Sequence, residues 1–235
     1  MAKNVVISGG SKGIGRALVF RFAAAGFNVY TYARSKPNLE KLKSEIEKRF
    51  PTISLRYRVC DASKKSSVQA FANQVKKHFD TIDVLINNVG VFLPGSILNE
   101  KEGVFETSLQ TNLASTYHLS RALIPKMTDR KKGHVFNICS TASITAYSNG
   151  GSYCISKFGM LGFSKLLREE LKPKNIKVTA VLPGATLTDS WNGTQLPENR
   201  FMSSEDIAEA IFNCYQLKTA LVEELILRPQ LGDIS

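Results

Sequence analysis

Two residues that could exchange a proton stand four positions apart in the segment Tyr153-Cys154-Ile155-Ser156-Lys157. This segment opens the longest stretch of helical character, and residues at positions i and i+4 share one face of a helix. A free tyrosine titrates near a pKa of ~10, which is too high for efficient proton transfer at neutral pH. A neighbouring ammonium group stabilises the phenolate and lowers that pKa. Tyr153 and Lys157 are therefore a candidate general acid/base pair, although the same spacing also suits a solvated surface pair.

A second candidate site is the glycine-rich run Ser8-Gly9-Gly10-Ser11-Lys12-Gly13-Ile14-Gly15. It connects an apolar, β-type segment to a segment of helical period. Glycines allow a tight turn and a close approach of the backbone to a ligand. The start of a helix offers free N–H groups and a positive dipole end. The run is thus a candidate phosphate-binding loop, although its spacing would also suit a plain strand-to-helix turn.

The next β-type segment favours one nicotinamide cofactor over the other. It ends in Tyr30-Thr31-Tyr32-Ala33-Arg34 and carries no acidic residue. An NAD site usually places a carboxylate there for the ribose 2′-hydroxyl, whereas a nearby arginine accommodates a 2′-phosphate. Lys12 could approach the same place, and the two cations together would pair with a phosphate. We therefore expect NADP, although each cation alone could be an ordinary surface residue.

The elements that must position these residues follow an alternating pattern. Short apolar runs at 4–8, 28–33, 54–59, 84–87, 135–139, 178–182 and 221–227 predict strands. Amphipathic stretches at 14–25, 39–49, 66–78, 153–171 and 204–217 predict helices. Alternating strands and helices predict an α/β fold, a doubly wound seven-stranded parallel sheet with helices on both faces. Nothing resembling a linker interrupts the chain, so we expect one domain over residues 1–235.

Composition excludes several other classes. The four cysteines show no CxxC spacing and lie mostly in apolar stretches, which favours free thiols and a cytoplasmic location. The three histidines are scattered, so we expect no metal site. No apolar run is long enough to cross a membrane. The net charge of +11 could attract nucleic acid, but the cations are dispersed and no recognition motif accompanies them.

Taken together, these segments resemble the single-domain branch of the short-chain dehydrogenase/reductase family, nearly from end to end. The family's Thr-Gly-x-x-x-Gly-x-Gly motif is similar to residues 8–15, where Ser8 keeps the hydroxyl of the usual threonine. The family's Asn-Asn-Ala-Gly motif reads Asn87-Asn88-Val89-Gly90 here, with valine in place of alanine. Further matches are Asp61 and Ala62 after the third strand, Asn112, Ser140, Pro183-Gly184 and Thr188. Ser140 precedes Tyr153 by thirteen residues, as in the family.

The resemblance implies a Rossmann-type fold and an NADP-dependent oxidoreductase. Tyr153 would protonate the substrate oxygen while NADPH delivers a hydride to the carbonyl carbon. Lys157 would lower the tyrosine pKa and bind the nicotinamide ribose, and Ser140 would hydrogen-bond the substrate oxygen. Asn112 would hold a water that links Lys157 to solvent, although it could instead cap or kink a helix; Ser143 competes with Ser140 by composition. The implied cofactor-binding residues are Gly9, Ser11, Lys12, Gly13, Ile14, Arg34, Asp61, Ala62, Asn88, Tyr153, Lys157, Thr186 and Thr188.

Substrate choice is expected to depend on residues 185–200, which contain Trp191, the single tryptophan of the chain. Trp191 could belong to a mobile lid, or it could pack on the protein body or a subunit contact. Tyr147 could also line the pocket. The C-terminal stretch resembles bacterial reductases of the sepiapterin-reductase-like group, which points to diketones or pterin side chains.

Three functional alternatives remain beside this carbonyl or alcohol substrate. They are a 3-oxoacyl thioester reductase, a non-catalytic NADP-sensing protein and a nucleic-acid-binding protein, of which we expect the last least. The apolar segment at 221–227 would be an exposed sheet edge if unpaired. We therefore expect a homodimer or homotetramer, as in relatives of this family.

Overall fold

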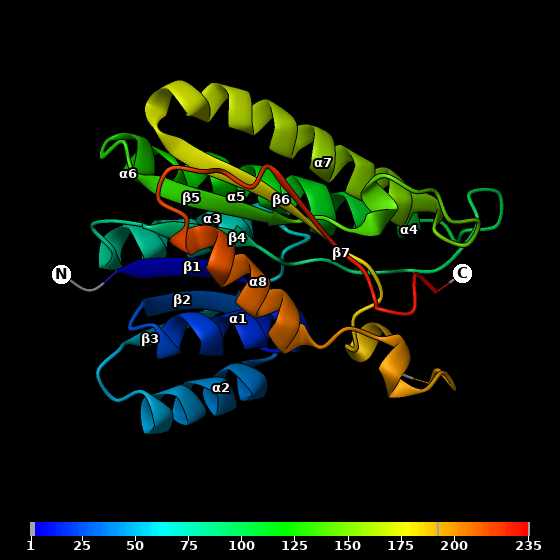
Figure 1. The fold of residues 1–235 in the computed structure, drawn as a ribbon, viewed down its shortest axis with the longest axis horizontal. Helices are drawn as coiled ribbons and strands as arrows, with labels where there is room; N and C mark the ends of the chain where they lie inside the picture. Colours follow the sequence, from blue (N-terminus) through cyan, green and yellow to red (C-terminus); the bar gives the residue numbers. More distant parts are fainter. Residues whose placement is uncertain (1–2, 192, 235) are drawn as a thin grey trace.

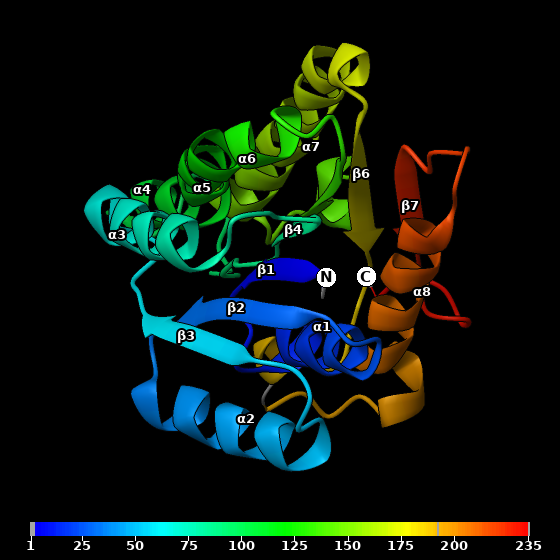
Figure 2. The ribbon, with the colours of Figure 1, turned by 90° about the vertical axis from the view of Figure 1, so that its left-hand side faces the viewer.

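The computed structural model describes residues 3–191 and 193–234, and its centre is one seven-stranded sheet (Figures 1 and 2). The strands are β1 (Asn4–Ser8), β2 (Asn28–Ala33), β3 (Leu55–Val59), β4 (Val84–Asn87), β5 (Gly133–Ile138), β6 (Ile176–Pro183) and β7 (Glu224–Leu227). All neighbours pair in parallel, in the order β3-β2-β1-β4-β5-β6-β7. This order reverses direction between β1 and β4, as in a doubly wound sheet. The predicted α/β fold is confirmed.

Helices cover both faces of this sheet. On one face lie α1 (Gly13–Ala24), α2 (Lys36–Arg49) and α8 (Ser204–Gln216). On the other face lie α3 (Lys65–His78), α5 (Ser115–Leu123), α6 (Pro125–Thr128) and α7 (Gly151–Leu171). In Figure 1, α2 is drawn below the strands and α7 above them. Because both faces are covered, the central strands read as continuous apolar runs rather than alternating ones.

The predicted helix and strand boundaries hold to within about three residues. The largest shifts are at α2, which was expected from residue 39 and begins at Lys36, and at β7, which was expected from residue 221 and begins at Glu224. The Thr179 side chain donates to the carbonyl of Val222 at 2.6 Å, so a side chain replaces part of the backbone ladder there. The segment 104–128, which the amphipathic pattern did not single out, is also helical. It comprises α4 (Val104–Ser108), a π-helical turn (Leu109–Ala114), α5 and α6.

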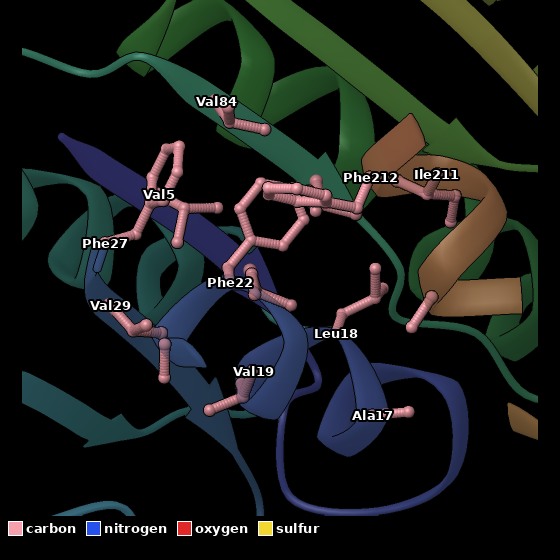
Figure 3. Packing of buried hydrophobic residues seen from close by; sticks show 14 of the residues in the cluster. Val5, Ala17, Leu18, Val19, Phe22, Phe27, Val29, Val84, Ile211 and Phe212 are labelled. Carbon is pink, nitrogen blue, oxygen red and sulfur yellow. The ribbon is translucent and has the colours of Figure 1, made fainter. Parts of the chain in front are cut away.

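Aromatic side chains join α1 and α8 over the sheet (Figure 3). The Phe22 ring of α1 lies edge-on to Phe212 of α8, with centroids 5.2 Å apart, and to Phe27 at 5.1 Å. Both Phe22 and Leu18 are fully buried among strand residues. This packing holds α1, the helix that follows the glycine-rich loop, against the sheet.

The described residues hold neither a membrane-spanning helix nor a cluster of metal-ligating side chains. No helix among them combines the length and apolar character that a membrane crossing requires. Within the same residues, no group of three or more His, Cys, Asp or Glu side chains could hold a metal ion. The four cysteines are buried and unpaired with one another.

Candidate active site

The glycine-rich loop forms a tight connection from β1 to α1. Gly9 and Gly13 have φ angles of +70° and +49°, which favour glycine. A Cβ at Gly15 would stand 2.1 Å from the Gly9 carbonyl oxygen, so no larger residue fits there. The backbone N–H of Gly10 donates to Thr31 Oγ1 at 3.0 Å, which ties the loop to β2. The first turn of α1 contains no acidic residue and no side-chain cap, so its N–H groups remain suited to an anion.

Ser8 and Asn88 tie this loop to the end of β4. The Ser8 hydroxyl accepts from the backbone N–H groups of Asn88 and Val89, at 2.8 and 2.9 Å. The Asn88 side-chain amide in turn donates to the carbonyl of Ser8 at 3.0 Å. Val89, the departure from the family motif, would be 3.0 Å from a Cβ at Gly9. Its extra bulk therefore packs against the glycine loop.

A cleft of about 650 Å³ opens where β4, β5 and β6 end. Figure 1 shows this edge on the right, near residues 185–200 and the C-terminal tail. Several of the predicted site residues line the cleft together: Ile14, Asn88, Ser140, Tyr153, Lys157, Thr186 and Thr188. Their convergence agrees with the rule that ligands bind beyond the carboxyl ends of parallel strands.

Burial sets the protonation of the Tyr153–Lys157 pair. Although Tyr153 as a whole is half-buried, burial of its hydroxyl end raises its pKa to about 12, against the opposing effect of the Ser140 hydroxyl. Burial also lowers the pKa of Lys157 to about 8. The Lys157 ammonium donates to the Ile138 carbonyl at 2.8 Å and lies 5.7 Å from the Tyr153 ring centroid. The pKa of Tyr153 is therefore raised where the sequence suggested a fall, because desolvation is the largest influence on it.

Ser140 and Ser143 occupy different positions, which separates the two candidates. Ser140 follows β5 and lines the cleft. The Ser143 hydroxyl accepts from the backbone N–H of Ser140 at 3.2 Å, as part of a capping box. The Ser143 side chain thus stabilises the short turn that follows Ser140, whereas Ser140 lines the cleft.

Asn112 lies behind the cleft, in the π-helical turn between α4 and α5. Its side chain is fully buried and bonds Val91 through both polar atoms, at 2.7 and 3.0 Å. It also donates to Ser156 Oγ on α7 at 2.9 Å. A Cβ placed on Gly90 would be 3.4 Å from Asn112 Oδ1 and 3.5 Å from Lys157 Nζ, so both groups border Gly90. The helix does distort at Asn112, and such π-turns are frequent at functional sites.

The predicted residues for the adenosine end lie outside the lining of the cleft, after β2 and β3. Arg34 is exposed, and its charge contributes to lowering the pKa of Asp61, an effect dominated by hydrogen bonds from Ser63. Ala62 is buried. Lys12 does not reach toward Arg34 but pairs with Asp189, Nζ to Oδ2, at 2.5 Å. Ser11 and Gly13 lie in the loop described above.

The segment 185–200, in which Asn192 lies outside the described residues, borders the cleft next to the glycine loop. Thr186 is buried, and Thr188 Cγ2 would stand 3.0 Å from a Cβ at Gly13. Trp191 lines the cleft, and its ring lies edge-on to Phe201 with centroids 4.9 Å apart. Trp191 therefore lines the cleft and packs on the buried Phe201 of the protein body, whereas a mobile lid stays a prediction.

Several cleft residues were not expected from the sequence, and three of them form the wall around Tyr153 and the C-terminal tail. The Phe92 ring stands edge-on to Tyr153, with centroids 5.0 Å apart. Asp233 and Ile234 bring the C-terminal tail to the cleft wall. Phe92 belongs to no spaced motif. Asp233 and Ile234 end the C-terminal stretch that resembles the sepiapterin-reductase-like group, and this resemblance was the available signal for them. Tyr147, by contrast, was expected at the pocket and lines it.

Comparisons with known proteins agree with this geometry. The short chain dehydrogenase family matches residues 3–199. Sepiapterin reductase of Chlorobaculum tepidum is 34% identical over 98% of this chain and 97% of its own. A 3-oxoacyl-acyl-carrier-protein reductase of Haemophilus influenzae is 30% identical, over 89% and 88%.

The structure resembles an alcohol dehydrogenase from the archaeon Thermococcus sibiricus solved with 5-hydroxy-NADP, with a TM-score of 0.91. That protein is 25% identical, and each chain is covered completely. A family match over most of the chain and a curated relative of nearly equal length support the same conclusion. This chain belongs to the short-chain dehydrogenase family of oxidoreductases.

Proposed function

We propose that the protein is an NADPH-dependent reductase of small carbonyl compounds. The observation that carries this proposal is the convergence of Ser140, Tyr153 and Lys157 on one cleft beside a glycine-rich loop. A hydroxyl pair and a buried ammonium at the carboxyl edge of a parallel sheet suit proton transfer to a carbonyl oxygen.

The residues at the glycine loop fit NADP. The open N-terminus of α1 suits a pyrophosphate, and the positive φ angles of Gly9 and Gly13 let the backbone approach it. Two exposed cations suit a 2′-phosphate: Arg34, and Lys12 when it leaves its partner Asp189. No carboxylate follows β2 to accept from a 2′-hydroxyl. The similar alcohol dehydrogenase was solved with an NADP derivative, which supports the same cofactor here.

In the proposed reaction, the nicotinamide of bound NADPH supplies the hydride. With a pKa of about 12, Tyr153 keeps its proton at neutral pH and can give it to the substrate oxygen. Ser140 stands next to the phenol and stabilises negative charge on that oxygen. The charged Lys157 stabilises the tyrosinate that remains. Asn112 holds the helix that carries both residues through its hydrogen bond to Ser156. The alcohol leaves, and Tyr153 regains a proton from solvent.

For the substrate class we propose diketones or the side-chain carbonyls of pterins. The 34% identity to a sepiapterin reductase supports this choice, and so does Asp233. Its Oδ2 accepts from Arg228 Nε at 2.8 Å, whereas its Oδ1 has no hydrogen-bond partner among the residues that the structure describes. A carboxylate oxygen without a partner is costly to bury. A ring bearing N–H donors could supply the missing partner.

We further propose that the whole chain forms one domain and that the enzyme acts as a homodimer or homotetramer in the cytoplasm. The outer face of α7 presents Ile155, Phe158 and Leu166, which are 43%, 47% and 61% exposed. Three apolar side chains on one helix face suit burial against a second copy. The buried free thiols suit a reducing compartment.

The decisive experiment measures NADPH oxidation with a panel of diketones, pterins, aldehydes and 3-oxoacyl thioesters, with NADH in parallel. We expect turnover of diketones or pterins with NADPH, slower turnover with NADH, and a ~100- to 10,000-fold lower kcat in Tyr153→Phe. Preference for the thioesters would favour the second candidate, which the 30% identity to a 3-oxoacyl-acyl-carrier-protein reductase supports. Tight NADPH binding without turnover on any substrate would favour a cofactor sensor.

Asp233→Asn separates the two preferred substrate classes. If Asp233 accepts from a pterin ring, the substitution raises KM for pterin substrates by roughly ten-fold, the value of one hydrogen bond to a charged group. The KM for a small diketone, which lacks the ring, stays unchanged. Equal effects on both substrates would contradict this role and indicate a structural one through Arg228.

A further inference from the structure

One ion pair joins the glycine loop to the segment 185–191. Lys12 Nζ stands 2.5 Å from Asp189 Oδ2, and both side chains are 60% exposed. Among the described residues of 185–202, Asp189 is the one that forms an ion pair. Next to it, the Thr188 methyl faces Gly13. The loop predicted to bind phosphate and the segment that borders the cleft thus meet at one charged contact.

The start of the segment 185–191 is held by backbone hydrogen bonds instead of an ion pair. The N–H of Leu187 donates to the carbonyl of Met202 at 2.9 Å, and the N–H of Met202 donates to Ala185 at 3.0 Å. Asp189 opens the short 3-10 turn that ends at Trp191, whose N–H donates to the carbonyl of Thr188 at 3.0 Å. Asp189 is therefore two residues from Trp191, whose indole lines the cleft, and a movement of Asp189 would reach that indole through the turn.

Lys12 is a single cation with two possible anionic partners. A phosphate monoester carries about −1.5 to −2 charges at pH 7, and it accepts hydrogen bonds through three oxygens. A carboxylate carries one charge, and an exposed ion pair is worth little. A 2′-phosphate close to Lys12 would therefore displace Asp189, whereas a 2′-hydroxyl would not.

We propose that Asp189 is a residue that determines cofactor specificity, because it competes with the 2′-phosphate of NADP for the Lys12 ammonium. Binding of the 2′-phosphate frees Asp189, so that residues 185–191 respond to this one group of the cofactor. The competition lowers the preference for NADP over NAD. This inference rests on the proposed use of NADP.

The first test measures the dissociation constants of NADP⁺ and NAD⁺ by calorimetry, for the full chain and for Asp189→Asn. Removing the competitor tightens NADP⁺ binding by about two- to five-fold, while NAD⁺ binding changes less. The gain shrinks at high ionic strength, because both side chains are exposed. In a Lys12→Ala background, Asp189→Asn produces no preferential gain.

Glu198→Gln provides the matched control. Glu198 is an exposed acid on the same stretch of chain and forms no ion pair in the described residues. Glu198→Gln removes one negative charge, as Asp189→Asn does, so a general electrostatic effect would appear in both variants. A gain confined to Asp189→Asn identifies the Lys12 contact as its origin.

The second test follows Trp191, the single tryptophan, by its fluorescence. Adenosine 2′,5′-bisphosphate carries the 2′-phosphate without a nicotinamide, and 5′-AMP lacks it. We expect the bisphosphate to change the emission, 5′-AMP to leave it nearly unchanged, and Asp189→Asn to remove the difference.

The outcomes separate this inference from the proposed cofactor. The protein could bind the bisphosphate tightly while Asp189→Asn leaves the ratio of the NADP⁺ and NAD⁺ dissociation constants unchanged. That result overturns the competition but not the choice of NADP. Failure to bind the bisphosphate more tightly than 5′-AMP overturns both the competition and the choice of NADP.

Discussion

At the residue scale, desolvation controls the two groups that could move a proton. Tyr153 keeps its proton because burial raises its pKa to about 12. Lys157 is charged at neutral pH but titrates near pH 8, because burial lowers its pKa. A proton donor and a cation that can lose its charge thus stand side by side, and only the second changes state near neutral pH.

This difference predicts the pH dependence of reduction. As pH rises through about 8, Lys157 loses its charge and can no longer stabilise the tyrosinate left by proton donation. We expect kcat/KM to fall above this pH, because kcat/KM reports the ionisations of the free enzyme. The measurement is a pH–rate profile at saturating NADPH. A profile that stays flat through this pH would contradict the role of the Lys157 charge.

At the element scale, the start of α7 is held by a carboxylate from another part of the chain. Glu100 accepts from the backbone N–H of Ser152 at 2.7 Å and from the Ser152 hydroxyl. The backbone N–H of Gly95 also donates to Asn149 at 3.1 Å. These contacts fasten the loop after β4, which carries Phe92, to the turn just before Tyr153. A carboxylate at this end of a helix also complements the helix dipole.

Removing this carboxylate tests whether it positions Tyr153. In Glu100→Ala the first turn of α7 loses its cap, and the free energy of unfolding falls by about 0.5–2 kcal/mol. We expect kcat to fall as well, with little change in cofactor affinity, because the glycine loop lies elsewhere. Thermal unfolding and steady-state kinetics measure both effects.

Glu102→Ala is the control for that change, since Glu102 is an exposed acid two residues away. It should alter neither the unfolding temperature nor kcat. A drop in stability without any change in kcat in Glu100→Ala would show that Glu100 stabilises α7 without positioning Tyr153.

At the scale of the whole molecule, apolar side chains gather on the outer face of the helical layer that carries Tyr153. Leu166 is 61% exposed on α7, and Tyr117 is 42% exposed on the neighbouring α5. Such surface is costly in water unless another surface covers it. A second copy of α7 is the proposed cover, and that contact would brace the helix that carries the acid/base pair.

A charge in this face should therefore separate the subunits. Leu166→Glu places a carboxylate in the proposed contact, where it would be buried without a partner. We expect size-exclusion chromatography with light scattering to show a smaller species than for the unmodified chain. Leu196→Glu, at another partly exposed apolar position, is the control. An unmodified chain that is already a monomer would contradict the proposed oligomer.

The sequence by itself determined the fold class, the order of strands and helices, and most of the residues that line the cleft. Apolar runs and helical periods are local signals, since each reflects which side of an element faces the core. The glycine loop and the Tyr153–Lys157 pair were visible as residue types at a local spacing, whereas Ser140 was expected from the resemblance to the family. The irregular turn at Asn112 gave no periodic signal, because a π-turn breaks the helical period.

Only the tertiary structure decided which distant groups meet and how they are protonated. Lys12 and Asp189 are 177 positions apart, and no pattern in the chain links them. Glu100 reaches α7, and Asp233 reaches the cleft, through contacts that depend on how the loops pack. The pKa of Tyr153 rises where the sequence suggested a fall, because burial depends on the whole fold, whereas spacing reveals only the neighbouring charge.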